Sequence, residues 1–254
     1  IITDRASKTL KIKLDALKKA YFVEFLIYEV EAENLKELRL SAHISTAAYF
    51  RLLAADLLPQ DLDKVLYLDS DLIVNQSIEE LIHLEIDDYF LAAWSHQVVT
   101  TKKRLDLNSD RYFNSGVMLM NLAAWRRDQI AQKTIQFAQE NPALLRFHDQ
   151  DALNKIVDGR FLHLPEKWNS LVDLYEARSK VTSDSVIIHF VGSLKPWQVW
   201  ALNADKEIYW KYLRQSPWSN ALPTFPTSLK QFLSAGHYLL SCVRKGKLKP
   251  KFAN

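Results

Sequence analysis

The sequence is poor in the residues that build disulfide-stapled, collagen-like or membrane-spanning chains. It has one cysteine, Cys242, which excludes an internal disulfide framework and any multi-cysteine metal site. Five glycines and eight prolines among 254 residues leave little room for flexible linkers. No apolar run approaches the roughly 20 residues that a bilayer-spanning helix needs. These absences favour a globular protein of a reducing compartment.

Neither sign of charge dominates the chain. The 33 basic and 30 acidic residues leave a formal net charge of +3, so the molecule as a whole is not built to bind polyanions. The basic residues do not form a stripe with aromatic residues, and we expect no nucleic-acid partner. The excess is local, because residues 244–251 contain five basic residues and no acidic one.

Hydrophobic periodicity predicts strands that alternate with helices. We expect helices over residues 7–20, 46–58, 122–139, 149–157 and 228–243, and strands over residues 23–30, 64–68, 90–94, 116–121 and 185–191. This alternation is typical of an α/β domain with a mostly parallel, doubly wound sheet. After Trp197 the pattern becomes helical and aromatic. We therefore predict one domain over residues 1–200 and a small helical, basic appendage over residues 201–254.

The strongest local signal is a pair of carboxylates that directly follow an apolar strand. The strand predicted over residues 64–68 leads into Asp69, Ser70 and Asp71. Residues i and i+2 of an extended chain point to the same face, so both carboxylates aim at one point beyond the strand, where open α/β sheets bind ligands. A divalent cation that also contacts phosphate would remove their repulsion. The alternative is a helix cap at Asp69 and a solvated turn residue at Asp71.

A second polar group follows the strand predicted over residues 185–191. His189 lies near the end of that strand, Gly192 marks a turn and Lys195 follows it. His189 would complete an Asp/Asp/His metal site, and an imidazole ligand favours Mn²⁺ over Mg²⁺. Lys195 would neutralise a diphosphate leaving group. The alternative is a satisfied core histidine beside an exposed lysine.

Four further residues have a structural and a functional interpretation. Asp149 and Gln150 open a predicted helix, so they either cap it or contact sugar hydroxyls and the reacting face. Asn114 lies in a polar turn before a strand, and Arg51 lies on a predicted helix. Taken alone, a plain turn and an ion-paired helix face are the simpler interpretations of these two.

Taken together and in order, these segments resemble glycosyltransferase family 8. That family includes bacterial glucosyl- and galactosyltransferases of lipopolysaccharide and lipooligosaccharide cores, and glycogenin. The matching segments are residues 48–52 (AYFRL), 62–74 (LDKVLYLDSDLIV), 112–126 (YFNSGVMLMNLAAWR), 148–154 (HDQDALN) and 189–197 (HFVGSLKPW). Five ordered motifs are far more specific than any one of them, and the resemblance extends from residue 1 to about residue 200.

The resemblance implies a GT-A type fold, in which helices flank a doubly wound mixed sheet. It also implies transfer of a hexose, glucose or galactose, from a UDP-sugar with retention at the anomeric carbon. A bound Mn²⁺, with Mg²⁺ as the alternative, would assist the departure of UDP. Retention through a covalent intermediate needs a carboxylate nucleophile. The matching residue, Gln150, is a poor nucleophile, so we expect front-face attack by the acceptor.

Positions that match the family's functional residues fall into three groups. The metal ligands correspond to Asp69, Asp71 and His189. The donor-binding residues correspond to Arg51, Asn114, Gly192 and Lys195. The catalytic pair beneath the transferred sugar corresponds to Asp149 and Gln150, with Gln150 on the side where a nucleophile would lie.

Two departures from the family's pattern put parts of this expectation in doubt. Family members begin with a strand and loop that precede the segment matching residues 1–4 and supply much of the uracil and ribose pocket, and we do not find that piece. Where many relatives place an acidic residue, this chain has Ser95, His96 and Gln97. The alternative function is therefore a degenerate or truncated, catalytically weak homologue that binds carbohydrate or nucleotide.

The predicted partners are a UDP-sugar donor and a saccharide or lipid-linked saccharide acceptor, such as lipopolysaccharide core. Basic residues contribute about 1 kcal/mol each near an anionic bilayer, so residues 244–251 indicate either a membrane contact or a solvated end. Tyr238, Leu239 and Leu240 would enter the interface. We expect a cytoplasmic protein, peripheral on the inner face of the membrane. A metal-dependent phosphoesterase or nucleotidyltransferase explains the carboxylate pair but not the segments at residues 148–154 and 189–197.

Overall fold

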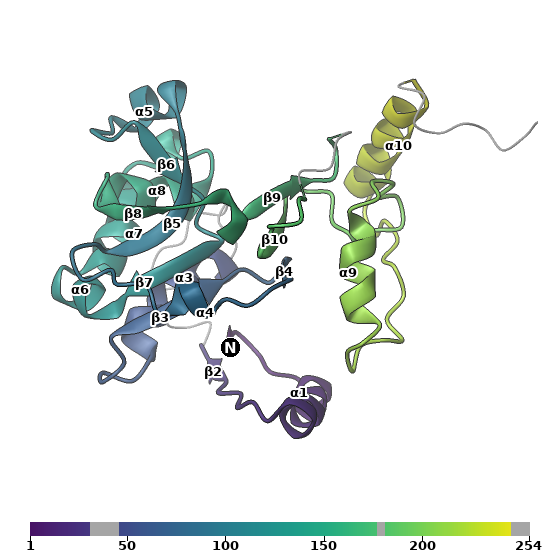
Figure 1. Cartoon of the computed structure of the whole chain (residues 1–254). Coiled ribbons are helices and arrows are strands. Elements are labelled where there is room, and N and C mark those ends of the chain that lie inside the picture. Colours follow the sequence, from purple (N-terminus) through teal and green to yellow (C-terminus); the bar gives the residue numbers. More distant parts are fainter. Residues whose placement is uncertain (31–45, 177–180, 245–254) are drawn as a thin grey trace, which may run out of the picture. The chain divides into compact units, whose positions relative to one another are not determined.

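The computed structural model describes residues 1–30, 46–176 and 181–244 (Figure 1). The chain divides into two compact units, and it crosses between them several times. Unit 1 comprises Ile1–Ser70, Val74–Asn169 and Asp184–Ile187, and unit 2 comprises Asp71–Ile73, Ser170–Ser183 and Ile188–Asn254. This division does not test the boundary that we predicted near residue 200, which stays a prediction.

The main sheet of unit 1 is mixed. Its strands are β3 (Lys64–Leu68), β7 (Val117–Asn121), β5 (Leu91–Gln97), β6 (Arg111–Phe113) and β8 (Phe161–Leu164). β7 is antiparallel to β3 and to β5, and β6 is antiparallel to β5, whereas β8 runs parallel to β5. The expectation of a mostly parallel sheet is wrong, because β6 and β7 are joined by three residues and both run back along β5 without a helical crossover.

The short connection between β6 and β7 interrupts their pairing with β5. Phe113 lies opposite Ser95, and Leu119 lies opposite Ala92. Five residues of one segment therefore span two residues of the other, which is an insertion of three residues. Such bulges re-aim side chains and occur near active sites. The bulge is the polar turn at residues 114–116.

Helices complete unit 1, and most of them begin or end close to the predicted residues. Among the described residues they are α1 (Lys8–Tyr21), α3 (Thr46–Leu57), α4 (Glu79–Ile82), α5 (Val99–Leu105), α6 (Leu122–Arg127), α7 (Ile130–Glu140) and α8 (His148–Val157), with 3₁₀ turns at Pro142–Leu144 and Glu166–Trp168. Ser7 caps α1, where its side chain accepts a hydrogen bond from the Leu10 N–H. Of the strand predicted over residues 23–30, only β2 (Tyr28–Glu29) forms, paired in parallel with β1 (Ile2–Thr3).

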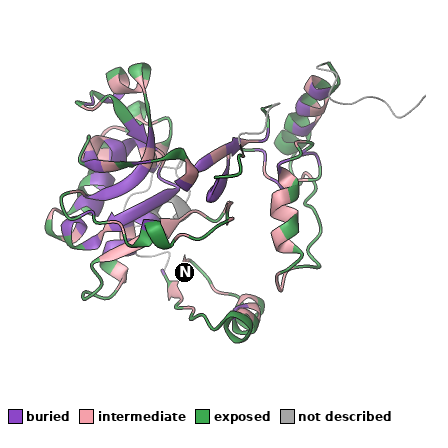
Figure 2. Cartoon of the chain, in the orientation of Figure 1, coloured by how far each residue is buried: buried purple, intermediate pink, exposed green. Residues whose placement is uncertain are grey.

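The single helix predicted over residues 122–139 is two helices. Gln129 adopts a left-handed conformation with φ 53°, which ends α6 and redirects the chain into α7. The break lets Trp125 of α6 and Ile130 and Ile135 of α7 pack into the same core cluster. Figure 2 shows that the buried residues of unit 1 are concentrated in its strands and the helices against them.

Arg126 of α6 ties the end of α3 to the loop that precedes β3. Its Nε donates to the Ala55 carbonyl at 2.8 Å, and its two Nη atoms donate to the carbonyls of Leu58, Pro59, Gln60 and Leu62 at 2.9–3.2 Å. All five N–H groups of the guanidinium thus have an acceptor. These bonds satisfy carbonyl groups that a helix end leaves without an intrahelical partner.

The described part of unit 2 has a smaller sheet and two helices. The sheet has the order β4 (Leu72–Val74), β10 (Ile187–Val191) and β9 (Ser170–Asp173), with β9 parallel to β10. The helices are α9 (Lys206–Leu213) and α10 (Leu229–Arg244). Tyr238 of α10 is buried in the core of unit 2, so it does not take the interfacial position that we expected.

Candidate active site

Arg51 lies at the centre of a buried polar cluster in unit 1. Its guanidinium donates to Asp69 Oδ1 at 3.0 Å and to the Ser115 carbonyl at 2.8 Å, and its Nε lies 3.1 Å from Asp149 Oδ2. The Tyr67 hydroxyl donates to the same Asp69 oxygen at 2.7 Å, and the Tyr67 ring lies against the guanidinium. Arg51 therefore connects a helix, the end of β3, the bulge after β6 and the start of α8.

The electrostatics of this cluster centre on Asp149. Burial raises the pKa of the Asp149 carboxyl, Arg51 acts in the opposite direction, and the Asp69 charge raises it further. Burial likewise raises the pKa of the Tyr67 hydroxyl above its ordinary value. One buried cation thus serves two carboxylates that would repel each other without it.

Gln150 is held by the bulge between β6 and β7. Its Oε1 accepts from Asn114 Nδ2 at 3.2 Å and from the Ser115 backbone N–H at 3.0 Å, while its Nε2 donates to the Tyr112 hydroxyl at 3.0 Å. Asn114 Oδ1 in turn accepts from Asn169 Nδ2 at 2.9 Å. The two amide side chains are fixed in orientation by one another and by the backbone.

Two residues that sequence reasoning missed hold this arrangement in place. Asp151 is fully buried and accepts from both Nη atoms of Arg104, at 2.9 and 3.1 Å, and from the Tyr112 hydroxyl at 2.7 Å. Asn154 pairs with both the N–H and the carbonyl of Phe113 at 2.9 and 3.0 Å. Both lie in the segment HDQDALN, so the signal that could have found them was present in a motif already singled out.

A second polar cluster lies in unit 2. His189 Nε2 is 3.2 Å from Asp71 Oδ1, and Lys195 Nζ donates to Asp71 Oδ2 at 2.6 Å and to the Phe190 carbonyl at 2.6 Å. Burial alone would raise the pKa of Asp71. The hydrogen bonds and charges of His189 and Lys195 outweigh that effect, and they hold the pKa well below its usual range.

The turn after β10 requires a glycine. Gly192 has φ +78°, in the left-handed region, and it directs the chain from β10 toward Lys195. The Lys195 N–H donates to Gln198 Oε1 at 3.0 Å, which fixes the backbone beyond the turn. His189, Gly192 and Lys195 are therefore positioned by one strand and the loop that follows it.

The predicted site residues thus form two groups, one in each unit. Unit 1 brings together Arg51, Asp69, Asn114, Asp149 and Gln150, and unit 2 brings together Asp71, His189, Gly192 and Lys195. Only Ser70 separates the two groups in the chain, between Asp69 and Asp71.

The donor atoms of unit 2 fit a divalent cation. Two ligand atoms at right angles about one ion, each about 2.1 Å from it, lie about 3 Å apart. The separation of 3.2 Å between Asp71 Oδ1 and His189 Nε2 matches this, and it also suits a hydrogen bond from the ring. Carboxylate with imidazole suits Mn²⁺ better than Mg²⁺.

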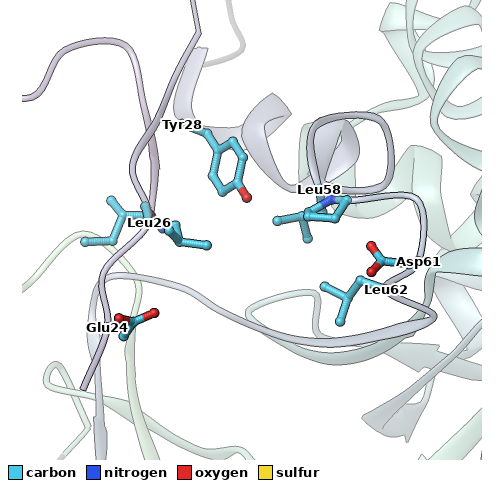
Figure 3. Close-up of a pocket in the computed structure, with 8 residues that line it drawn as sticks. Glu24, Leu26, Tyr28, Leu58, Asp61 and Leu62 are labelled. Carbon is cyan, nitrogen blue, oxygen red and sulfur yellow. The ribbon is translucent and has the colours of Figure 1, made fainter. Parts of the chain in front are cut away.

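A pocket of about 510 Å³ lies elsewhere in unit 1 (Figure 3). Ile1, Leu26, Tyr28 and Leu58 are among the residues that line it, and none of the predicted site residues does. It therefore contributes nothing to the clusters described above.

Comparison with known proteins identifies the family. The family model "Glycosyl transferase family 8" matches residues 1–201 of this chain. The chain belongs to this family. The resemblance predicted from its five segments is confirmed.

Curated members of glycosyl transferase family 8 match most of the chain. It is 28% identical to lipopolysaccharide 1,2-glucosyltransferase of Escherichia coli over 242 residues, which cover 90% of this chain and 72% of the relative. It is also 28% identical to lipopolysaccharide 1,3-galactosyltransferase of Salmonella typhimurium over 255 residues, covering 95% of this chain and 76% of the relative.

Among solved structures, the galactosyltransferase LgtC in complex with donor and acceptor sugar analogs has the same fold. The two structures superpose with a TM-score of 0.69 at 24% sequence identity, and the alignment covers 87% of this chain and 84% of the LgtC chain. The mixed α/β fold of the family 8 enzymes, of GT-A type, is therefore confirmed. This likeness does not test our prediction that the first strand and loop of the family's fold are missing from this sequence.

Proposed function

We propose that the chain is a retaining hexosyltransferase that moves glucose or galactose from a UDP-sugar to a saccharide acceptor, with lipopolysaccharide core as the acceptor class. Family membership supports glycosyl transfer. The activities of two relatives, one a glucosyl- and one a galactosyltransferase of lipopolysaccharide, support the sugar and acceptor classes.

We assign Asp69, Asp71 and His189 as ligands of a divalent cation, Mn²⁺ in preference to Mg²⁺. The single observation that carries this assignment is the contact between Asp71 and His189. Asp71 lies two residues after Asp69, which directly follows β3. One intervening residue keeps the two carboxylates near each other. When bound, the cation supplies Lewis-acid stabilisation of the charge on departing diphosphate.

The remaining residues act on the donor. Lys195 holds a positive charge beside Asp71, where it would offset the charge of the leaving phosphate. Asn114 and Gln150 offer a fixed amide face to sugar hydroxyls. Gln150 Oε1 already accepts from Asn114 and Ser115, which supports an orienting role rather than a covalent one. We therefore assign front-face attack by the acceptor hydroxyl.

The test is UDP release from a panel of UDP-sugars, with Mn²⁺, with Mg²⁺ and with EDTA. We expect release that requires metal and that falls at least a hundredfold in Asp71→Asn and in His189→Ala. The matched controls are Asp110→Asn and His237→Ala, whose side chains are exposed and belong to neither cluster. The anomeric configuration of the product, measured by NMR, tests retention.

The outcomes separate the proposal from its alternative. Metal-independent release, or unchanged release in both variants, contradicts the ligand assignment. Binding of UDP-sugar without release from any donor supports the catalytically weak homologue. A product with inverted configuration contradicts front-face attack.

A further inference from the structure

One face of α10 exposes a continuous apolar stripe. Leu229, Phe232, Leu233, Leu240 and Val243 are each between 55% and 76% exposed. At 3.6 residues per turn, these five side chains and Gly236 fall within an arc of about 100°. In Figure 2 the first turns of α10 are exposed, and buried, intermediate and exposed residues alternate along the rest of the helix.

From Ala235 onward, the opposite face of the same helix packs within unit 2. Ala235, Tyr238 and Cys242 are buried in its core, and the Tyr238 hydroxyl donates to the Leu174 carbonyl at 3.4 Å. The core of unit 2 therefore packs against other residues of α10 and leaves the stripe uncovered. An exposed apolar surface of this kind marks an interaction site.

The charges around the stripe identify the partner. Lys230, His237 and Arg244 lie together along one flank of the stripe, about 60–100° around the helix from Leu229. The sequence contains no Asp or Glu after Glu207, whereas eight Lys and Arg residues follow that position. An apolar stripe with a cationic flank and no acidic residue suits the interface of an anionic bilayer, where basic side chains reach the headgroups.

We propose that α10 lies in the plane of an anionic membrane surface, with Phe232, Leu233 and Leu240 inserted and its Lys/Arg flank on the headgroups. No helix in the described ranges combines the length and apolarity that crossing a bilayer requires. The contact that we propose for α10 is therefore with the membrane surface. The basic residues that we predicted at the membrane lie, after Arg244, outside the described residues, and the inference rests on α10 itself.

The geometry makes the two forces additive. Apolar insertion contributes in proportion to the buried area. Attraction to anionic lipid falls off within a Debye length and weakens with salt. Removing either the stripe or the anionic lipid should therefore weaken binding, and we expect measurable binding only when both are present.

The experiment measures binding of the whole chain to unilamellar vesicles of phosphatidylcholine alone and of phosphatidylcholine with 30% phosphatidylglycerol, by flotation. We expect binding only to the anionic vesicles, weakened at least tenfold by 0.5 M NaCl. The triple variant Phe232→Ser, Leu233→Ser, Leu240→Ser should also bind at least tenfold more weakly. The matched control replaces three exposed apolar residues of unit 1, Ile12, Phe22 and Val99, by serine.

Three results would overturn the inference. The first is that the α10 variant binds anionic vesicles as well as the wild type does. The second is that the unit 1 control loses as much vesicle binding as the α10 variant. The third is that the wild type binds no vesicles but forms a dimer, which the α10 variant converts to a monomer. UDP release without vesicles is measured in parallel. A chain that floats with anionic vesicles but releases no UDP refutes the proposed function and leaves this inference standing.

Discussion

Replacing Asp151 by asparagine should strongly destabilise unit 1. The carboxylate is fully buried and accepts two hydrogen bonds from Arg104 and one from Tyr112. It also accepts the backbone N–H groups of Arg146 and Phe147 at 2.6 and 2.8 Å. An asparagine keeps one acceptor oxygen and turns the other into a donor that faces donors.

The magnitude follows from the burial of the pair. Removing one partner of a buried ion pair costs about 3–5 kcal/mol, because it leaves an uncompensated charge. Here that charge is the Arg104 guanidinium, which is itself mostly buried. With a urea m-value of about 3 kcal/mol/M, the unfolding midpoint should fall by roughly 1–1.7 M. The surface pair of Arg127 with Asp128 is the control, and Asp128→Asn should leave the unfolding midpoint nearly unchanged.

The pH dependence gives an independent check. Burial would raise the pKa of Asp151, but the bonds from Arg104, the backbone and Tyr112 lower it below its ordinary value. Its stabilising contribution is therefore present above the unfolded pKa of about 3.9 and is lost as the pH falls toward the folded pKa. The difference in unfolding free energy between wild type and Asp151→Asn should be constant from pH 7 to 5 and shrink below pH 4. A midpoint shift under 0.3 M, or a difference that grows in acid, would refute the reasoning.

Two further substitutions test the local geometry. Gly192→Ala places a side chain in the left-handed region and should lower the free energy of unfolding by about 1–2 kcal/mol, measured by thermal unfolding. Gly236→Ala, in open space on α10, should instead raise it by up to about 1 kcal/mol. Equal effects of the two substitutions would contradict the turn argument. Arg51→Met leaves two carboxylates without their cation and should lower the free energy of unfolding in urea by about 3–5 kcal/mol. Arg51→Lys should recover part of that loss. An Arg51→Met variant as stable as the wild type would show that the cluster is not held by charge.

Features that depend on neighbouring residues could be predicted from the sequence. β3 occupies the predicted residues Lys64–Leu68, because an apolar run bounded by charged residues specifies a strand locally. The metal-ligand candidates were found because two of them follow that strand. The observed starts of α1 and α8 likewise lie within one residue of the predicted positions 7 and 149.

Features that depend on contacts between residues distant in sequence could not be predicted. The partners of Arg51 include Asp69 and Ser115, 18 and 64 residues away in sequence, and no local pattern connects them. The left-handed residue that breaks the helix after Arg127 is Gln129, a residue type that gives no turn signal. In HDQDALN the buried, most heavily bonded residue is Asp151, because tertiary contacts with Arg104 and Tyr112 decide its role.

The five carbonyls around Arg126 have a consequence for the local unfolding of α3 and β3. A guanidinium surrounded by main-chain oxygens resembles a cation in a ring of carbonyl ligands, with the ring formed by the last residues of α3 and the loop to β3. A lysine offers three donors on a point charge and cannot close such a ring. Because that loop leads directly into β3 and Asp69, the chain segment before the site is fixed by a side chain that belongs to neither polar cluster. Amide hydrogens of α3 and β3 should therefore exchange through one shared opening event rather than through separate local ones.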